Sequence, residues 1–194
     1  MKNITSLLST LITANHILSH HAVLDPFGHI SVRNPNTNTT FFIALQIGPA
    51  TVSSPADIGE YHIADGTPLP GTVGGYAERY IHSEILKRYP DVNGVVHSHS
   101  EDVLPYTVLD YAGNGNGDGD GGGKGMLGMQ PVYHMAGFLG GEVPNFDIEA
   151  VYDEGEPRDM LVNSVRLGGA LAEMFGRNET RVTLPLHTTV LMRG

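Results

Sequence analysis

The middle of the chain contains a helix that leads, through one short turn, directly into a buried strand. Apolar residues within 77–89 fall on one stripe of a helix, and Pro90 then ends it. Residues 92–98 follow almost at once, with the continuous apolar character of a buried strand. Such a unit has to lay its helix against a sheet. The chain is therefore restricted to folds that combine helices and strands in layers.

Apolar spacing predicts further elements on both sides of this unit. Helical spacing covers residues 3–20 and residues 157–175, where Pro157 suits the first turn and Gly176 the C-terminal cap. Two short apolar runs around a turn predict a hairpin of residues 29–33 and 41–47. Shorter patterns predict strands at residues 60–63 and 189–192, and a short helix at 101–109.

These elements predict one domain over residues 1–194. Its class is α/β (α+β), with three α/β/α layers around a mostly antiparallel sheet. Residues 113–125 contain eight glycines in thirteen positions and are expected to form a flexible surface loop. This loop matches neither of two ligand motifs. Lys124 is not followed by Ser or Thr, as a phosphate-binding loop requires, and Leu127 stands where a calcium loop needs glutamate.

Composition excludes several classes of protein. The chain has no cysteine, which rules out a thiol nucleophile and a cysteine zinc cage and favours a cytoplasmic protein without disulfides. The net charge is −10, and residues 142–159 carry seven carboxylates against one arginine. No basic stripe is present to bind nucleic acid or an anionic membrane. The apolar runs are far shorter than the roughly 20 residues of a membrane span.

Two histidines on the central strand are candidates for metal binding. His97 and His99 flank Ser98, so their side chains point to the same face of a strand. Two neutral imidazoles so placed can share one cation, although packed or surface histidines show the same spacing. Glu78 and His82, four residues apart, share one face of the preceding helix. That helix can bring the Glu78 carboxylate to the imidazoles as a proton carrier or ligand, and a surface glutamate is the alternative.

This combination resembles the core of the class II aldolase/adducin family. The resemblance covers nearly the whole chain. It lies in Glu78-x-x-x-His82, the turn at residues 89–93, the strand at residues 94–99, and residues 28–33, which are similar to the family's Gly-Asn-x-Ser-x-Arg strand.

The resemblance implies a site and a reaction. His97 and His99 would bind a divalent metal, most often zinc, with manganese, iron, cobalt or nickel as alternatives. Glu78 would be the catalytic acid and base. The reaction would cleave a carbon–carbon bond through a metal-stabilised enolate. The resemblance also implies a homo-oligomer, a tetramer with active sites at subunit contacts.

Two departures from the family pattern concern the substrate. Tyr76-Ala77 stands where sugar-phosphate members have a Ser-Ser pair, and His29 replaces the asparagine of the early strand. Both replaced groups hold phosphate, so a sugar phosphate is disfavoured and a carboxylate or phenolic acid is expected. His29 and His134 are the candidate substrate-binding residues, with Arg33 as a further partner for the anion. Structural roles remain the alternative for Arg33 and His134.

A third departure concerns the metal. Residues 190–194 resemble the family's C-terminal strand, after which a His-Gly pair supplies a third ligand, but the sequence ends at Gly194. Either the chain is truncated at this point, or two histidines and one carboxylate form the site. His187 precedes the strand and is not counted as a ligand.

The sequence thus favours a divalent-metal-dependent carbon–carbon lyase of aldolase or decarboxylase type. Its expected substrate is a non-phosphorylated, carboxylated small molecule. An isomerase or epimerase with the same metal is the first alternative, with Tyr133 or His134 as a second proton carrier. A non-catalytic adducin-like binding module is the other.

Overall fold

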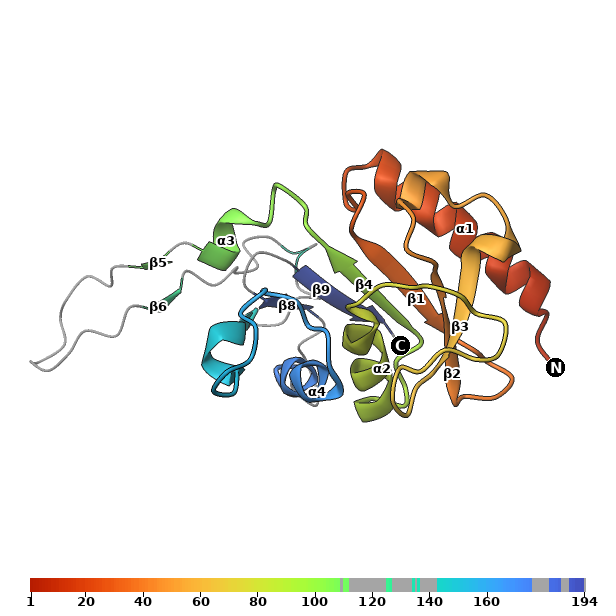
Figure 1. Ribbon diagram of the computed structural model, residues 1–194. Coiled ribbons are helices and arrows are strands. Elements are labelled where there is room, and N and C mark those ends of the chain that lie inside the picture. The colour runs from red at the N-terminus through yellow and green to blue at the C-terminus, as the bar shows by residue number, and fades with distance from the viewer. Residues whose placement is uncertain are drawn as a thin grey trace, which may run out of the picture.

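The computed structural model describes residues 1–108, 110–111, 125–126, 134, 136, 143–175, 182–185 and 189–193. A seven-stranded sheet runs through this part of the chain in the order β3-β2-β1-β4-β9-β8-β7 (Figure 1). Its neighbouring strands pair antiparallel except for β7 and β8, which are parallel. The strands are β1 (His29–Arg33), β2 (Thr40–Ala44), β3 (Ile58–His62), β4 (Gly94–Ser98), β7 (Asn145–Phe146), β8 (Val182–Pro185) and β9 (Thr189–Arg193). A separate pair consists of β5 (Asp110–Tyr111) and β6 (Gly125–Met126).

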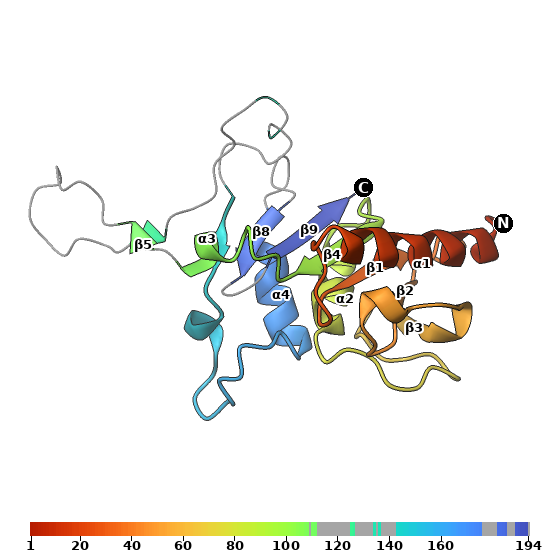
Figure 2. The same cartoon turned by 90° about the horizontal axis from the view of Figure 1, so that it is seen from above.

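Helices cover both faces of the sheet. Helix α1 (Ile4–His20) lies on one face, and α2 (Arg79–Arg88) and α4 (Val165–Glu173) lie together on the other (Figures 1 and 2). The shorter helices are α3 (Pro105–Val108) and the 3₁₀ turns η1 (Pro49–Thr51), η2 (Pro55–Asp57) and η4 (Ile148–Val151). The predicted three-layer α/β/α fold around a mostly antiparallel sheet is confirmed.

The main core lies between the sheet and the α2–α4 pair. All five residues of β2 are buried, as expected for a strand covered on both faces. Gly168 allows the two helices to approach closely, because a Cβ atom at this position would overlap the carbonyl oxygen of Tyr80. The core side chains include Phe41, Ile43, Tyr61, Ile81, Ile85, Leu167, Leu171 and Phe175.

Arg33 fastens the C-terminal end of α2 to strand β1. Its guanidinium donates hydrogen bonds to the carbonyl oxygens of Leu86 (2.6 Å), Tyr89 (3.2 Å) and Val92 (2.9 Å). The last carbonyls of a helix lack partners within the helix, and a cation there also meets the negative end of the helix dipole. Arg33 is 6% exposed, and these hydrogen bonds support the structural role that was the alternative to binding a substrate anion.

The helix predicted over residues 157–175 is wrong in its first half. Helix α4 begins only at Val165, where the side chain of Ser164 accepts a hydrogen bond from the backbone N–H of Leu167 (3.3 Å). Before it, Met160 has a φ of +64°. The Asp159 carboxylate accepts from the Leu161 N–H (3.0 Å) and competes with helix formation.

Other boundaries shift by a few residues. The strand predicted at residues 41–47 is β2, the strand at residues 60–63 begins earlier as β3, and the short helix predicted at residues 101–109 is limited to α3. Strands β7 and β8 were not predicted. Residues 113–124, Tyr133, Gly176 and His187 lie outside the described residues. No helix that the structure describes has the length and apolar character needed to cross a membrane.

Replacing Arg33 tests its structural role. Arg33→Met should lower the free energy of unfolding by about 3 kcal/mol, because buried helix carbonyls lose charged donors. Arg88→Met is the matched control. Arg88 contacts Glu173 at 3.4 Å on an exposed surface, and such pairs contribute less than about 1 kcal/mol. Urea unfolding measures both, and equal effects would contradict the assignment.

Candidate metal centre

The pairing of β1 with β4 places two histidines side by side. His29 is directly opposite His97 in the antiparallel register. The two rings stack with centroids 4.7 Å apart and an angle of 26° between their planes. Both side chains are buried, His29 at 1% exposure and His97 at 0%. The sheet therefore presents two imidazoles on one face, beneath the N-terminal end of α2.

Glu78 approaches these histidines from that end of α2. It is the residue immediately before the helix, and its side chain makes no capping hydrogen bond. Its Oε2 lies 3.3 Å from Nε2 of His97, and its Oε1 accepts from the N–H of Val162 at 3.2 Å. The helix–turn–strand unit thus brings Glu78 against His97, and the non-helical segment before α4 holds the other oxygen.

Glu78 is ionised at neutral pH. Burial raises the pKa of its carboxyl, but attraction to His97, the hydrogen bond with His97 and the Val162 N–H together lower this pKa below its ordinary value. The carboxylate can therefore accept a proton or bind a cation. Both uses agree with the roles predicted for it.

His29, Glu78 and His97 form a group that can hold a metal ion. Each offers one ligand atom, and these atoms all lie within 4.8 Å of one another. Nε2 of His29 is buried and has no hydrogen-bond partner among the described residues. Two imidazole nitrogens and a carboxylate oxygen suit zinc and related divalent metals. The donor set and the unpartnered nitrogen fit a cation at this position.

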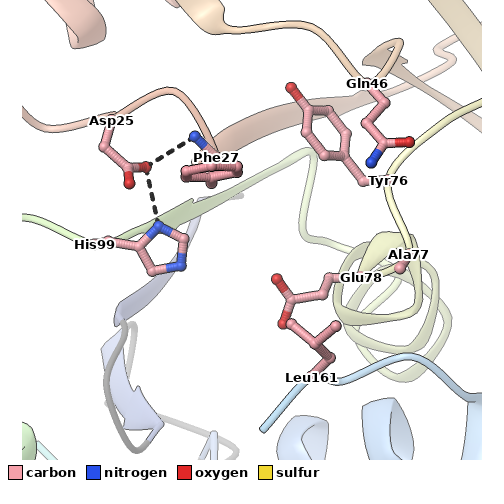
Figure 3. Close-up of a pocket in the computed structure, with 8 residues that line it drawn as sticks. All are labelled: Asp25, Phe27, Gln46, Tyr76, Ala77, Glu78, His99 and Leu161. Carbon is pink, nitrogen blue, oxygen red and sulfur yellow. Dashed lines mark hydrogen bonds and ion pairs between the residues drawn. The ribbon is translucent and has the colours of Figure 1, made fainter. Parts of the chain in front are cut away.

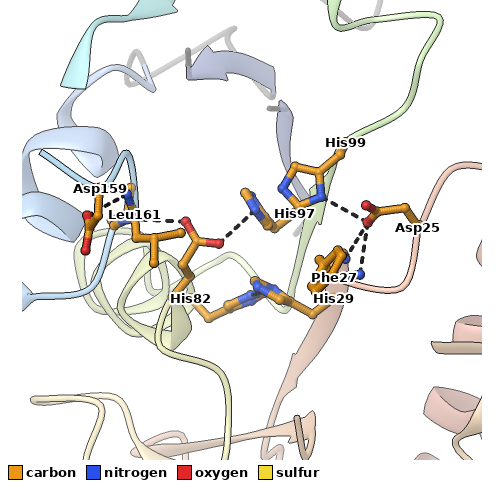
Figure 4. Close-up of polar contacts among 11 residues, drawn as sticks. Asp25, Phe27, His29, His82, His97, His99, Asp159 and Leu161 are labelled. Carbon is orange, nitrogen blue, oxygen red and sulfur yellow. Dashed lines mark hydrogen bonds and ion pairs between the residues drawn. The ribbon is translucent and has the colours of Figure 1, made fainter. Parts of the chain in front are cut away.

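His99 lies next to this group without being one of its three members. Its ring meets that of His97 edge-on, with centroids 4.7 Å apart. Nδ1 of His99 is 2.9 Å from Oδ1 of Asp25, so Nε2 is the nitrogen available to a ligand (Figure 4). Carboxylates commonly orient metal-binding imidazoles in this way. The ligand role of His99 stays a prediction.

The two predicted substrate-binding histidines lie in different surroundings. Burial, and then the neighbouring His97 and His82, lower the pKa of His29 well below its ordinary value, so its ring is neutral. It adds no positive charge for an anion. His134 is exposed and is not one of the residues lining the pocket described below. Binding of substrate by either histidine stays a prediction.

A chain of hydrogen bonds extends from His29 into the core. Nδ1 of His29 is 2.7 Å from Nε2 of His82 (Figure 4). Nδ1 of His82 is in turn 2.7 Å from Oγ of Ser31. Burial lowers the pKa of His82 to about 3, with a further contribution from His97. The sequence placed His82 on the face of Glu78. The sequence gave no sign that His82 contacts Ser31 on β1, which lies 51 residues earlier.

A pocket of about 480 Å³ opens beside Glu78 and His99 (Figure 3). Tyr76 lines this pocket, and the centroid of its ring is 4.4 Å from that of His29. The Tyr76 hydroxyl donates a hydrogen bond to the Ile47 carbonyl at 2.6 Å. Most of the wall was not predicted to be functional. Glu78 and His99 were predicted for the site, and Tyr76-Ala77 was noted where sugar-phosphate members hold phosphate. The lining residues are Asp25, Phe27, Gln46, Tyr76, Ala77, Glu78, His99 and Leu161.

The metal-free protein should lose stability in mild acid. The pKa of His82 falls from 6.5 in the unfolded chain to about 3 in the folded protein. Between these values only the unfolded chain binds the extra proton. The stability contributed by neutral His82 is thus complete above pH 6.5 and is lost as the pH falls. At about 1.4 kcal/mol per pH unit, His82 contributes a loss of about 2 kcal/mol by about pH 5.

Urea unfolding with chelator at about pH 7.5 and about pH 5 measures this loss. His29 acts in the same direction, since its pKa is also lowered. His82→Gln removes one titrating ring and should show a shallower pH dependence than the unmodified protein. The same dependence in both proteins would contradict the assignment.

Known proteins share this fold and much of the sequence. The decarboxylase tropJ of Talaromyces stipitatus is 42% identical over 186 residues, which are 95% of this chain and 64% of that protein. The chain therefore spans less than two thirds of that relative. The structure is similar to YgbL from Klebsiella pneumoniae, a putative aldolase/epimerase/decarboxylase, with a TM-score of 0.71 and 15% identity over 100% of this chain and 81% of that one.

A second similar structure is the L-fuculose-1-phosphate aldolase from Thermus thermophilus. Its TM-score is 0.63 with 18% identity, covering 95% of this chain and 77% of the aldolase. At these identities the two solved structures support the fold alone. Residues 9–192 match the model of the Class II Aldolase and Adducin N-terminal domain. This match covers most of the chain, and the chain therefore belongs to the class II aldolase/adducin family.

Proposed function

We propose that this protein is a divalent-metal-dependent carbon–carbon lyase of decarboxylase type. One observation carries the proposal: an ionised Glu78 stands beside buried imidazoles, at the edge of a pocket that can admit a small molecule. A carboxylate and a cation site at one place can supply the proton transfer and the charge stabilisation by which a carboxyl group is replaced by a proton. The 42% identity with a protein named a decarboxylase supports the same reaction.

The pocket favours an aromatic or other flat acid over a sugar phosphate. Its lining residues include the carboxylates Asp25 and Glu78 but neither lysine nor arginine. A phosphate dianion carries twice the charge of a carboxylate and would thus meet stronger repulsion, without a cationic side chain among these residues to offset it. Phe27, which is 73% exposed, and Leu161, which is 39% exposed, offer apolar surface in the same pocket as Tyr76. Such surface suits the ring of a carboxylated substrate.

Glu78 would carry the proton through the reaction. As the bond to the carboxyl group breaks, the electron pair stays on the substrate carbon and carbon dioxide leaves. The ionised Glu78 takes the proton of a substrate hydroxyl and returns it to that carbon, which balances the reaction. A divalent cation bound nearby supplies positive charge that stabilises the negative charge developing on the substrate.

The finer features of the site belong to the same proposal. His97 and His99 are ligands, with Glu78 as a further ligand until substrate binds. Zinc is the expected metal because nitrogen and carboxylate donors suit it, and manganese, iron, cobalt or nickel suit the same donors. The tetramer implied by the family remains part of this proposal. Size-exclusion chromatography with light scattering tests it.

Metal removal and Glu78→Gln test the reaction. Chelation should abolish carbon dioxide release from a panel of aromatic hydroxy acids, and re-addition of zinc should restore it. Glu78→Gln should lower kcat by about 10²–10⁴-fold, since it removes the proton carrier. Mass spectrometry of the products separates the alternatives. Turnover that survives complete metal removal, an aldehyde product or an isomer of unchanged mass would each contradict decarboxylation.

Shortening the pocket wall tests the substrate class. Phe27→Ala and Leu161→Ala should each raise KM for an aromatic acid by about 10-fold with little change in kcat, because each removes apolar contact of about 1–3 kcal/mol. Val73→Ala, at a position 80% exposed that does not line the pocket, is the control. Unchanged KM in both pocket variants would argue against an apolar substrate.

A further inference from the structure

His29 has one ring nitrogen in use and one aimed at the metal group. Its Nδ1 contacts His82 at 2.7 Å, whereas its Nε2 is buried without a hydrogen-bond partner in the described part of the chain. The same residue is one of the three that offer ligand atoms within 4.8 Å of one another. A buried nitrogen next to two other donors is placed to bind a cation through its lone pair.

The contacts of His82 are compatible with a proton on Nδ1 of His29, which leaves the lone pair of Nε2 for a cation. A neutral imidazole has one N–H and one lone pair, so each ring can donate once and accept once. If Nε2 of His29 binds a cation, the proton of His29 must be on Nδ1 and must be donated to Nε2 of His82. His82 then carries its own proton on Nδ1 and donates it to Oγ of Ser31, 2.7 Å away. The hydroxyl can accept it.

Secondary structure fixes this chain of contacts. His29 and Ser31 are two residues apart on β1, so both side chains point to the same face of the sheet. His82 lies one helical turn beyond Glu78, with 0% of its side chain exposed. The ring of Phe41 stacks on that of His82 with centroids 6.2 Å apart. Strand and helix thus hold both imidazoles in place.

We propose that His29 is a metal ligand through Nε2, and that His82 and Ser31 are positioning residues that keep the proton of His29 on Nδ1. This inference rests on the metal site of the proposed function and assigns it a ligand from strand β1. It also gives His29 a role different from the substrate binding predicted from the sequence. Residues that accept the second N–H of a metal-binding histidine commonly set its tautomer and orientation.

Two substitutions of His82 separate the proton acceptor from the space that it fills. In His82→Gln, the side-chain carbonyl oxygen can still accept the N–H of His29, whereas His82→Met fills similar space without a strong acceptor. Zinc affinity, measured by competition with a chromophoric chelator, should fall about 10–100-fold in His82→Met and stay within a few-fold of the unmodified protein in His82→Gln. Equal affinity in the two variants would overturn the role of His82.

The ligand itself is tested with cobalt. Co²⁺ reports its donors through its visible absorption spectrum, so His29→Gln should change the spectrum and weaken binding. His62→Gln is the control, because His62 is an exposed histidine on β3. An unchanged spectrum and affinity in His29→Gln would overturn the assignment of His29.

Ser31 provides a test that does not depend on whether His82→Met folds. Ser31→Ala removes the last acceptor and should weaken zinc binding about 10-fold, whereas Ser31→Thr keeps a hydroxyl and should restore it. Equal binding by both would overturn the role of Ser31.

The outcomes of these experiments also separate the further inference from the proposed function. A protein that binds no metal contradicts the proposed function, whereas normal metal binding in all these variants contradicts this inference alone.

Discussion

The antiparallel pairing of β1 with β4 is the constraint on which the site depends. It sets His29 opposite His97, so two residues 68 positions apart in the sequence become neighbours on one face of the sheet. A slip of one residue would turn one of these side chains to the opposite face. Arg33, at the other end of β1, holds the end of α2 and so keeps the helix in line with the strands. Register and helix position are thus set by the same strand.

The site places polar groups where a folded protein normally places apolar ones. His29, His82 and His97 are fully or almost fully buried, and Glu78 is mostly so. Burial of such groups is unfavourable unless each finds a partner. Ser31 is a hydrogen-bond partner of His82, and the Val162 N–H is a partner of Glu78. The core cluster around Phe41 and Ile85 supplies the compensating apolar burial.

The sequence was most informative where local patterns coincide with local structure. The helix–turn–strand unit, the hairpin of β1 and β2 and the first helix follow from apolar spacing and turn residues, and they placed Glu78 and His97 together correctly. Family resemblance supplied what spacing could not, namely the expectation of a particular metal and the class of reaction. His29 was recognised as a replacement, but its contact with His97 depends on strand register, which spacing alone does not give.

The errors and the open alternatives have a common physical origin in long-range partners. Residues 157–164 have helical spacing, yet the Val162 N–H bonds to Glu78, and a helix there would direct this N–H to its own backbone. Arg33 has a charge suited to an anion, but the end of α2 needs its donors. Asp25 was given no role in the site, because its partner His99 lies 74 residues later. In each case the deciding contact joins segments that are distant in the chain.

The carboxylate of Asp25 contacts both the turn that carries Phe27 and the ring of His99. Oδ1 of Asp25 accepts the N–H groups of Phe27 (3.2 Å) and Gly28 (2.7 Å) and also contacts His99. Phe27 and His99 both line the pocket, and His99 also lies against His97 of the metal group. The backbone of Phe27 and the ring of His99 therefore share one hydrogen-bond acceptor. If a ligand that displaces Phe27 alters the contact of Asp25 with His99, thermodynamic linkage requires that a change at His99 affect binding of that ligand by the same free energy.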